Sequence, residues 1–154
     1  MRIDHINIVT KNCDEHILFF TKIFGFKVTL DTNLAGHWID ELMNIPNVSS
    51  RVIFLESEDK DACRIELLEF NNQLNSSIPN KTEPNKVTNI GIRHFAVNVD
   101  DIDKIVENTI KHGYKLYSNK VVEVPIEILP KGKKLVYINA PEGVIIEACE
   151  VGYL

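Results

Sequence analysis

The sequence predicts an α+β protein made of two tandem βαβββ modules that form a curved mixed sheet around a cleft. Three observations predict this fold. A strand-then-helix pattern begins near residue 2 and again near residue 91, a glycine stops each helix, and each half closes with an apolar strand that carries an acidic residue at its centre. Because one such unit cannot bury a core alone, we expect a single domain over residues 1–154.

The first strand and helix of the two halves follow the same pattern. Residues 2–9 (RIDHINIV) and 91–99 (GIRHFAVNV) alternate in polarity after an early histidine, which is typical of half-buried strands. Each helix that follows has an expected N-cap, Asn12 in the first and Asp100 or Asp101 in the second. Its apolar stripe then ends at a stop glycine. The stripes are Ile17, Phe20, Ile23 and Phe24, and then Ile102, Ile105, Val106, Thr109 and Ile110.

The closing strands are also alike. They read ACRIELLEF at 62–70 and GVIIEACEV at 143–151, with Glu66 and Glu147 at their centres. A polar stretch rich in Asn, Ser and Pro separates the two halves. We therefore expect module 1 at about residues 1–70, a linker at about 71–89, and module 2 at about 90–154.

The composition narrows the class of protein. A net charge of −5 argues against a nucleic-acid surface, which needs clustered cations. No apolar run is long enough for a membrane helix, and the first residues lack the pattern of a secretory signal. The three cysteines show no CxxC spacing and are expected to be reduced and mostly buried. We expect a cytoplasmic protein that binds a small molecule, without nucleic-acid or membrane partners.

Four residues stand at equivalent places in the two modules: His5, Glu66, His94 and Glu147. A carboxylate in the middle of an apolar strand carries a heavy desolvation cost unless it is paired or coordinated. Two neutral imidazoles and two carboxylates suit a divalent first-row metal ion, with coordination positions left for substrate. The pattern therefore predicts one metal site made by these four residues. The alternative is that they are ordinary strand residues at sheet margins.

Four motifs in order, IDHINIV, RIELLEF, RHFAVNVDDID and INAPEGVIIEACE, resemble the vicinal oxygen chelate superfamily. Within it, the chain is most similar to the glyoxalase I and methylmalonyl-CoA epimerase branch. The resemblance implies one divalent ion (Zn, Ni, Co, Mn or Fe), held by His5, Glu66, His94 and Glu147, that binds two vicinal oxygens of a small substrate.

The resemblance further implies a glyoxalase- or epimerase-type lyase or isomerase that moves a proton next to a carbonyl through a metal-bound enolate. Glu147 would be both ligand and base, and Glu66 is the other candidate base by the pseudo-symmetry of the modules. Open sheet edges and the habit of the family predict a homodimer. Two alternatives stay open: a non-catalytic binding or resistance protein of the same fold, and an iron-dependent dioxygenase.

Other positions bear on the substrate. The second carboxylate of the epimerases is matched here by Val52, which weakens that assignment. His37 and Trp38 are expected either to line the cleft or, in the case of Trp38, to anchor an irregular loop. Lysines around Gly132 could meet an anionic substrate, although a solvated turn is favoured. They are Lys131, Lys133 and Lys134. Cys149 lies on the strand face of Glu147 and is expected to be simply buried.

Overall fold

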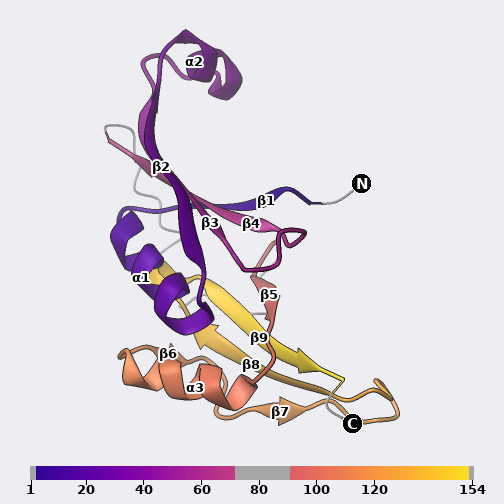
Figure 1. Ribbon diagram of the computed structural model, residues 1–154. Coiled ribbons are helices and arrows are strands. Elements are labelled where there is room, and N and C mark those ends of the chain that lie inside the picture. Colours follow the sequence, from indigo (N-terminus) through magenta and orange to yellow (C-terminus); the bar gives the residue numbers. More distant parts are fainter. Residues whose placement is uncertain (1–2, 72–90, 153–154) are drawn as a thin grey trace. The chain divides into compact units, whose positions relative to one another are not determined.

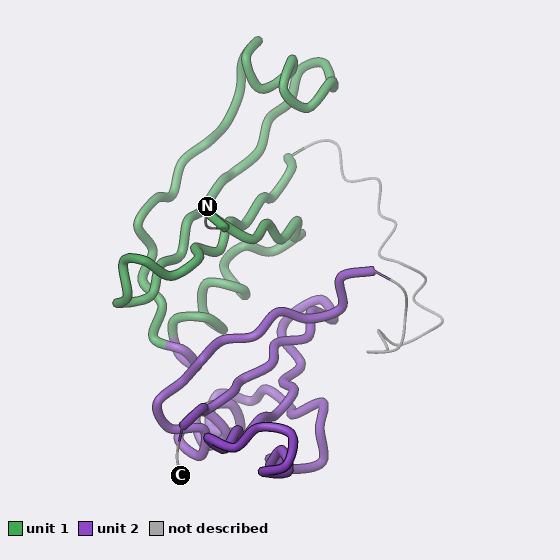
Figure 2. The backbone as a smooth tube through the Cα atoms, turned by 90° about the vertical axis from the view of Figure 1, so that its right-hand side faces the viewer, with its two compact units in different colours: residues 1–21, 25–79 green, residues 22–24, 80–154 purple. Residues whose placement is uncertain are grey.

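The computed structural model describes residues 3–71 and 91–152, and most of the expected linker at 71–89 lies outside these residues. The chain divides into two compact units, residues 1–21 with 25–79 and residues 22–24 with 80–154 (Figure 2). No helix in the described ranges is long and apolar enough to cross a membrane.

The first unit holds one βαβββ module with an added short helix (Figure 1). Its sheet has the order β1-β4-β3-β2, in which β1 is parallel to β4 and the other pairs are antiparallel. The register sets Glu66 on β4 between Asn7 on β1 and Phe54 on β3. The elements are β1 (His5–Val9), α1 (Cys13–Phe24), β2 (Lys27–Ala35), α2 (His37–Met43), β3 (Ser49–Glu56) and β4 (Arg64–Phe70).

The second unit repeats this topology, with the sheet order β5-β9-β8-β6 and β7 paired with β8. Again the first strand is parallel to the last, and Glu147 on β9 lies between Ala96 and Tyr137. Two short strands stand where the first module has one long strand. The elements are β5 (His94–Asn98), α3 (Ile102–Lys111), β6 (Lys115–Leu116), β7 (Val122–Glu123), β8 (Lys133–Asn139), the 3-10 helix η1 (Pro141–Gly143) and β9 (Ile145–Val151). The predicted α+β class with two βαβββ modules is confirmed.

Both helices begin at the expected caps. The Asn12 side chain accepts from the Glu15 N–H at 3.1 Å, and the Asp101 side chain accepts from the Lys104 N–H at 2.9 Å, so Asp101 rather than Asp100 caps α3. Gly25 ends α1 in the left-handed conformation with φ of 73°, which a residue without Cβ adopts at no steric cost.

The predicted apolar stripes were only partly right. On α1 the buried side chains include Cys13, His16 and Phe19, whereas Ile17 and Phe24 are half-buried. Because Cys and His were not counted as core residues, the stripe was placed about one position off. On α3, Ile110 is 62% exposed, so the stripe is narrower than predicted.

Each sheet has one face whose centre is apolar. Alternating residues of β3 and β4, and of β8 and β9, form it and are at most 2% exposed. Glu66 and Glu147 occupy the intervening positions and therefore point to the opposite face. These apolar residues are Ile53, Leu55, Ile65 and Leu67 in the first unit and Val136, Ile138, Ile146 and Ala148 in the second.

A second glutamate in each closing strand holds the helix of its own module. The backbone N–H of Cys13, the first residue of α1, donates to Glu69 Oε2 at 2.8 Å, and the N–H of Ile102, the first residue of α3, donates to Glu150 Oε2 at 2.9 Å. A carboxylate at this place satisfies an orphan donor and complements the helix dipole. Neither residue was predicted from the sequence, although the E-x-x-E spacing repeated in the two closing strands was the signal.

We expect Glu69→Ala and Glu150→Ala each to lower the free energy of unfolding by about 1–3 kcal/mol, because each leaves a part-buried N–H without its acceptor. Urea denaturation measures this loss. The matched control is Glu58→Ala, which removes an 84% exposed carboxylate that pairs with Lys27 and should change stability by less than about 1 kcal/mol. Losses no larger than that of the control would contradict the role of Glu69 and Glu150.

Candidate metal centre

The first unit brings His5 and Glu66 together. His5 is the first residue of β1 and Glu66 the third of β4, and their Nε2 and Oε2 atoms are 3.5 Å apart. Asn7, which is paired with Glu66 across the strands, donates its Nδ2–H to the same Oε2 at 2.8 Å. The imidazole and the carboxylate are 38% and 16% exposed, so both remain accessible to a small ligand.

The second unit brings His94 and Glu147 together in the same way. His94 begins β5 and Glu147 is the third residue of β9, and Nε2 and Oε2 are 3.4 Å apart. The Tyr137 ring lies against the imidazole, with 4.9 Å between ring centroids. The other oxygen of Glu147, Oε1, accepts from Lys133 Nζ at 2.7 Å. The carboxylate is 9% exposed and is thus deeper than Glu66.

The two imidazole–carboxylate pairs use the same atoms at equivalent positions. Two ligands bound at right angles with bonds of about 2.1 Å lie about 3 Å apart, so separations of 3.4 and 3.5 Å are close to what a shared ion requires. Over residues 3–71 and 91–152, no three His, Cys, Asp or Glu side chains gather as one metal-binding group. Each pair supplies two nitrogen or oxygen donors, and the four-residue centre stays a prediction.

A carboxylate contacts the imidazole of His5 at Nδ1, the ring nitrogen that does not face Glu66. Asp4 Oδ2 lies 2.9 Å from His5 Nδ1 and also accepts from Arg64 Nη2. The guanidinium of Arg64 lies 4.4 Å from the centroid of the Phe54 ring, and this ring is in T-shaped contact with His5. Hydrogen bonds from His5 and Arg64 both lower the pKa of the Asp4 carboxyl group, and the bond from His5 has the larger effect. Asp4 was not predicted from the sequence, although it directly precedes His5 in the IDHINIV motif.

Lys133 does not belong to a solvated turn, and that interpretation was wrong for this residue. It is the first residue of β8, its side chain is 23% exposed, and its ammonium group is paired with Glu147. The hydrogen bond to Glu147 raises the pKa of Lys133. The cause of the error is register: the β8–β9 pairing puts Lys133 on the face of Glu147, which spacing alone did not reveal.

His37 and Trp38 lie far from the pair in their own unit. They begin α2, which follows Ala35, and the partner of Ala35 on β3 is Ser49, five residues from Phe54 beside Glu66. At the strand rise, this separation is about 16 Å. Trp38 is also 57% exposed, so it does not anchor the loop. Ile39, which is 1% exposed, has that role.

Val52 and Cys149 are both buried residues of the ligand-bearing faces. Val52 is 1% exposed on β3, and the register puts it on the same face as Glu66, where its side chain offers no carboxylate. Cys149 is buried as expected, and burial raises the pKa of its thiol. Cys13 is also buried, and burial raises the pKa of that thiol to about 12, whereas Cys63 is half-buried. Neither buried thiol is a reactive nucleophile.

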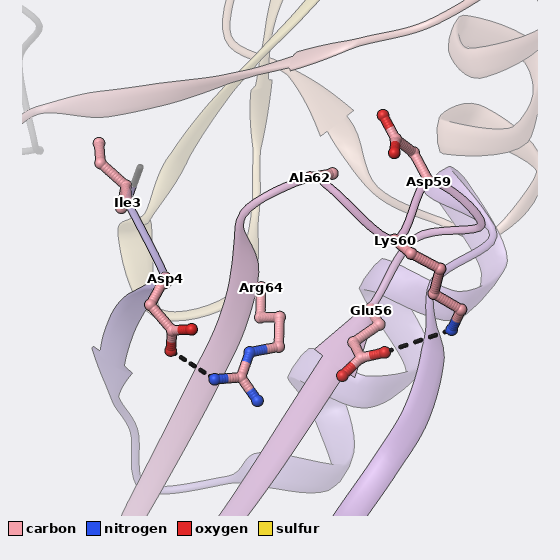
Figure 3. Close-up of a pocket in the computed structure, with 7 residues that line it drawn as sticks. All are labelled: Ile3, Asp4, Glu56, Asp59, Lys60, Ala62 and Arg64. Carbon is pink, nitrogen blue, oxygen red and sulfur yellow. Dashed lines mark hydrogen bonds and ion pairs between the residues drawn. The ribbon is translucent and has the colours of Figure 1, made fainter. Parts of the chain in front are cut away.

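A cavity of about 330 Å³ opens at the end of the first sheet (Figure 3). Its charged walls are two ion pairs: Asp4 with Arg64, and Glu56 with Lys60 at 3.4 Å. Asp59 adds a third carboxylate, so the walls carry one net negative charge. The cavity touches the site through Asp4, while His5 and Glu66 do not line it.

Comparison with known proteins supports the assignment of the fold. The glyoxalase family protein from Bacillus cereus is 26% identical, with a TM-score of 0.80 over 98% of this chain and 94% of that chain. The trypanothione-dependent glyoxalase I of Leishmania major is 18% identical, with a TM-score of 0.61 over 97% and 86% of the two chains. The fosfomycin resistance protein FosX of Mesorhizobium loti is 13% identical, with a TM-score of 0.56 over 96% and 89%.

At these identities, the Leishmania and Mesorhizobium structures show the fold alone. A search of curated proteins returned no match. The sequence of residues 4–127 does match one protein family, and this match extends over most of the chain. The chain therefore belongs to the glyoxalase/bleomycin resistance protein/dioxygenase superfamily, also called the vicinal oxygen chelate superfamily.

Proposed function

We propose that this protein is a metal-dependent lyase or isomerase of the glyoxalase or epimerase type, acting in the cytoplasm on a small substrate with vicinal oxygens. The observation that carries the proposal is the repeated imidazole–carboxylate pair, His5 with Glu66 at 3.5 Å and His94 with Glu147 at 3.4 Å. A binding protein without a metal has no need to keep such a pair in each module. Both pairs also lie in partly buried surroundings, where ligand carboxylates are rarely left without a partner.

The four side chains would hold one divalent ion, with Zn, Ni, Co, Mn and Fe as the candidates. When bound, such an ion polarises substrate oxygens and makes the neighbouring C–H more acidic. The chain itself supplies the proton acceptor. Glu147 is our first candidate, and Glu66 is the alternative. Lys133 keeps Glu147 Oε1 occupied, which leaves Oε2 as the oxygen that faces His94.

Two measurements test the proposal. Metal content by mass spectrometry after gentle purification should show one divalent ion per chain. Solvent deuterium exchange, followed by NMR, should then occur in at least one member of a panel of α-hydroxycarbonyl, hemithioacetal and acyl-CoA compounds. Exchange in none of them, with each candidate ion supplied, would favour a non-catalytic binding or resistance protein. Bound iron with oxygen consumption would instead indicate a dioxygenase.

We also propose that the protein forms a homodimer. The nine-residue strand β2 is at an edge of its sheet, and all but one of its residues are exposed, Val28 and Leu30 among them at 42%. Long exposed edges are commonly covered by a second copy. We expect sedimentation at micromolar concentration to give twice the mass of one chain. A single-chain mass under these conditions would contradict the dimer.

A further inference from the structure

The two imidazoles of the proposed metal site are not held alike, although the modules repeat. In the first module, Asp4 precedes His5, and Arg64 is paired with His5 across the strands. The equivalent positions in the second module hold Arg93 and Ile145, neither of which can accept a side-chain hydrogen bond. His94 Nδ1 is buried and has no hydrogen-bond partner among the described residues. The two rings therefore differ at Nδ1, which faces a carboxylate in His5 and has no acceptor among the described residues in His94.

We propose that Asp4, held by Arg64, is a positioning residue that fixes His5 in the tautomer with a free Nε2 lone pair. This inference rests on the proposed function, since it concerns how a ligand of the same site is prepared for an ion. A carboxylate only accepts, so the 2.9 Å contact requires the proton on His5 Nδ1. The lone pair then lies on Nε2, the atom that faces Glu66.

Without Asp4, the local geometry would favour the other tautomer. Glu66 Oε2 is 3.5 Å from Nε2 and would favour the tautomer with the proton on that nitrogen. A protonated Nε2 has no lone pair with which to bind a metal ion. Asp4 opposes this by accepting a hydrogen bond from the Nδ1–H group. His94 Nδ1 has no such acceptor among the described residues, and the carboxylate beside the ring is that of Glu147, with Oε2 3.4 Å from Nε2. The metal-free protein should therefore hold its two site imidazoles in opposite tautomers.

The orientation of Asp4 is itself supported. Arg64 bonds to the same oxygen, and its guanidinium packs on Phe54, the ring that is also in T-shaped contact with His5 (Figure 3 shows the Asp4–Arg64 pair). Asp4 is 62% exposed, so the pair should contribute little to stability. The effect of Asp4 on metal binding by His5 can be much larger than its effect on stability. Loss of the hydrogen-bond partner of a ligand histidine typically weakens metal binding about 10- to 100-fold.

The first experiment needs no metal. Long-range ¹H–¹⁵N correlation spectra at pH 8 should show His5 protonated on Nδ1 and His94 on Nε2 in the wild type. Asp4→Ala should move His5 toward the Nε2–H form. Asp4→Asn, which keeps an acceptor oxygen, should preserve more of the Nδ1–H form. The control Glu58→Ala, which removes an exposed carboxylate of the same unit, should change neither ring.

The second experiment measures the dissociation constant of Zn²⁺ by competition with a chelator. Asp4→Ala should weaken binding about 10- to 100-fold, with Asp4→Asn in between. In a His5→Ala background, Asp4→Ala should have little further effect, because Asp4 acts through His5. A merely structural role would instead lower the melting temperature and leave the tautomer unchanged.

The outcomes separate the two proposals. An unchanged His5 tautomer in Asp4→Ala, or His5 protonated on Nε2 in the wild type, overturns the positioning role whatever the metal affinity. A tautomer shift in a protein whose wild type binds no divalent ion supports the positioning of His5 and overturns the proposed metal-dependent function. A shift together with the loss of Zn²⁺ affinity supports both.

Discussion

Glu147→Gln should slow proton exchange into a substrate by about 100- to 10,000-fold, the usual cost of removing a general base, while a measurable share of the metal stays bound. An amide oxygen can still bind an ion and can still accept from Lys133 Nζ, but the amide cannot take up a proton. The substitution therefore separates the ligand role from the base role. Deuterium exchange followed by NMR, with metal content measured on the same sample, gives both quantities.

The controls for this variant come from the same chain. Glu41→Gln alters an exposed carboxylate that lies 3.1 Å from His37 and should leave exchange unchanged. Val52→Ala should also leave the chemistry largely intact, since Val52 offers no base, although its burial means that stability will fall. If Glu147→Gln exchanges as fast as the wild type, then Glu66 becomes the base to test.

His5→Ala and His94→Ala should each lower the bound metal sharply and reduce the melting temperature of the metal-loaded protein. An ion that binds only the folded state adds about 2.7 kcal/mol of stability when its concentration is 100 times its dissociation constant. This contribution disappears when the histidine that binds the ion is removed. Mass spectrometry measures the metal, and thermal unfolding with and without added ion measures the stability.

A matched control for these histidines is His37→Ala. His37 also faces a glutamate, at 3.1 Å, but its side chain is 86% exposed on α2, outside the predicted site. It should change neither metal content nor the melting temperature that depends on metal. Full metal content in both His5→Ala and His94→Ala would remove the site from consideration.

Most of the fold could be predicted because its signals are local and occur twice. Caps such as Asn12 and Asp101 depend on a few neighbouring residues, and strand alternation needs only a period of two. The repeat singled out four ligand-type residues at equivalent places, and the structure brings His5 to Glu66 and His94 to Glu147. The joining of the two pairs around one ion remains a prediction.

What the sequence did not reveal depends on neighbours from other strands. The partner of Lys133 follows from the β8–β9 register, and Asp4 has its role because Arg64 lies across from β1. The α1 stripe was misplaced because its buried face includes a histidine and a cysteine, which hydrophobic periodicity does not count. Each error comes from treating a segment without its tertiary surroundings.

The closing strands also limit how this chain can change by insertion or deletion. Glu66 and Glu69 are three residues apart, as are Glu147 and Glu150, and an odd spacing sends the two carboxylates of each strand to opposite faces. A gain or loss of one residue between them would make the spacing even and direct both carboxylates to the same face of the sheet. Either the helix N-terminus or the imidazole would then lose its carboxylate partner. A single-residue insertion or deletion between these glutamates should therefore disrupt either the helix contact or the imidazole–carboxylate pair.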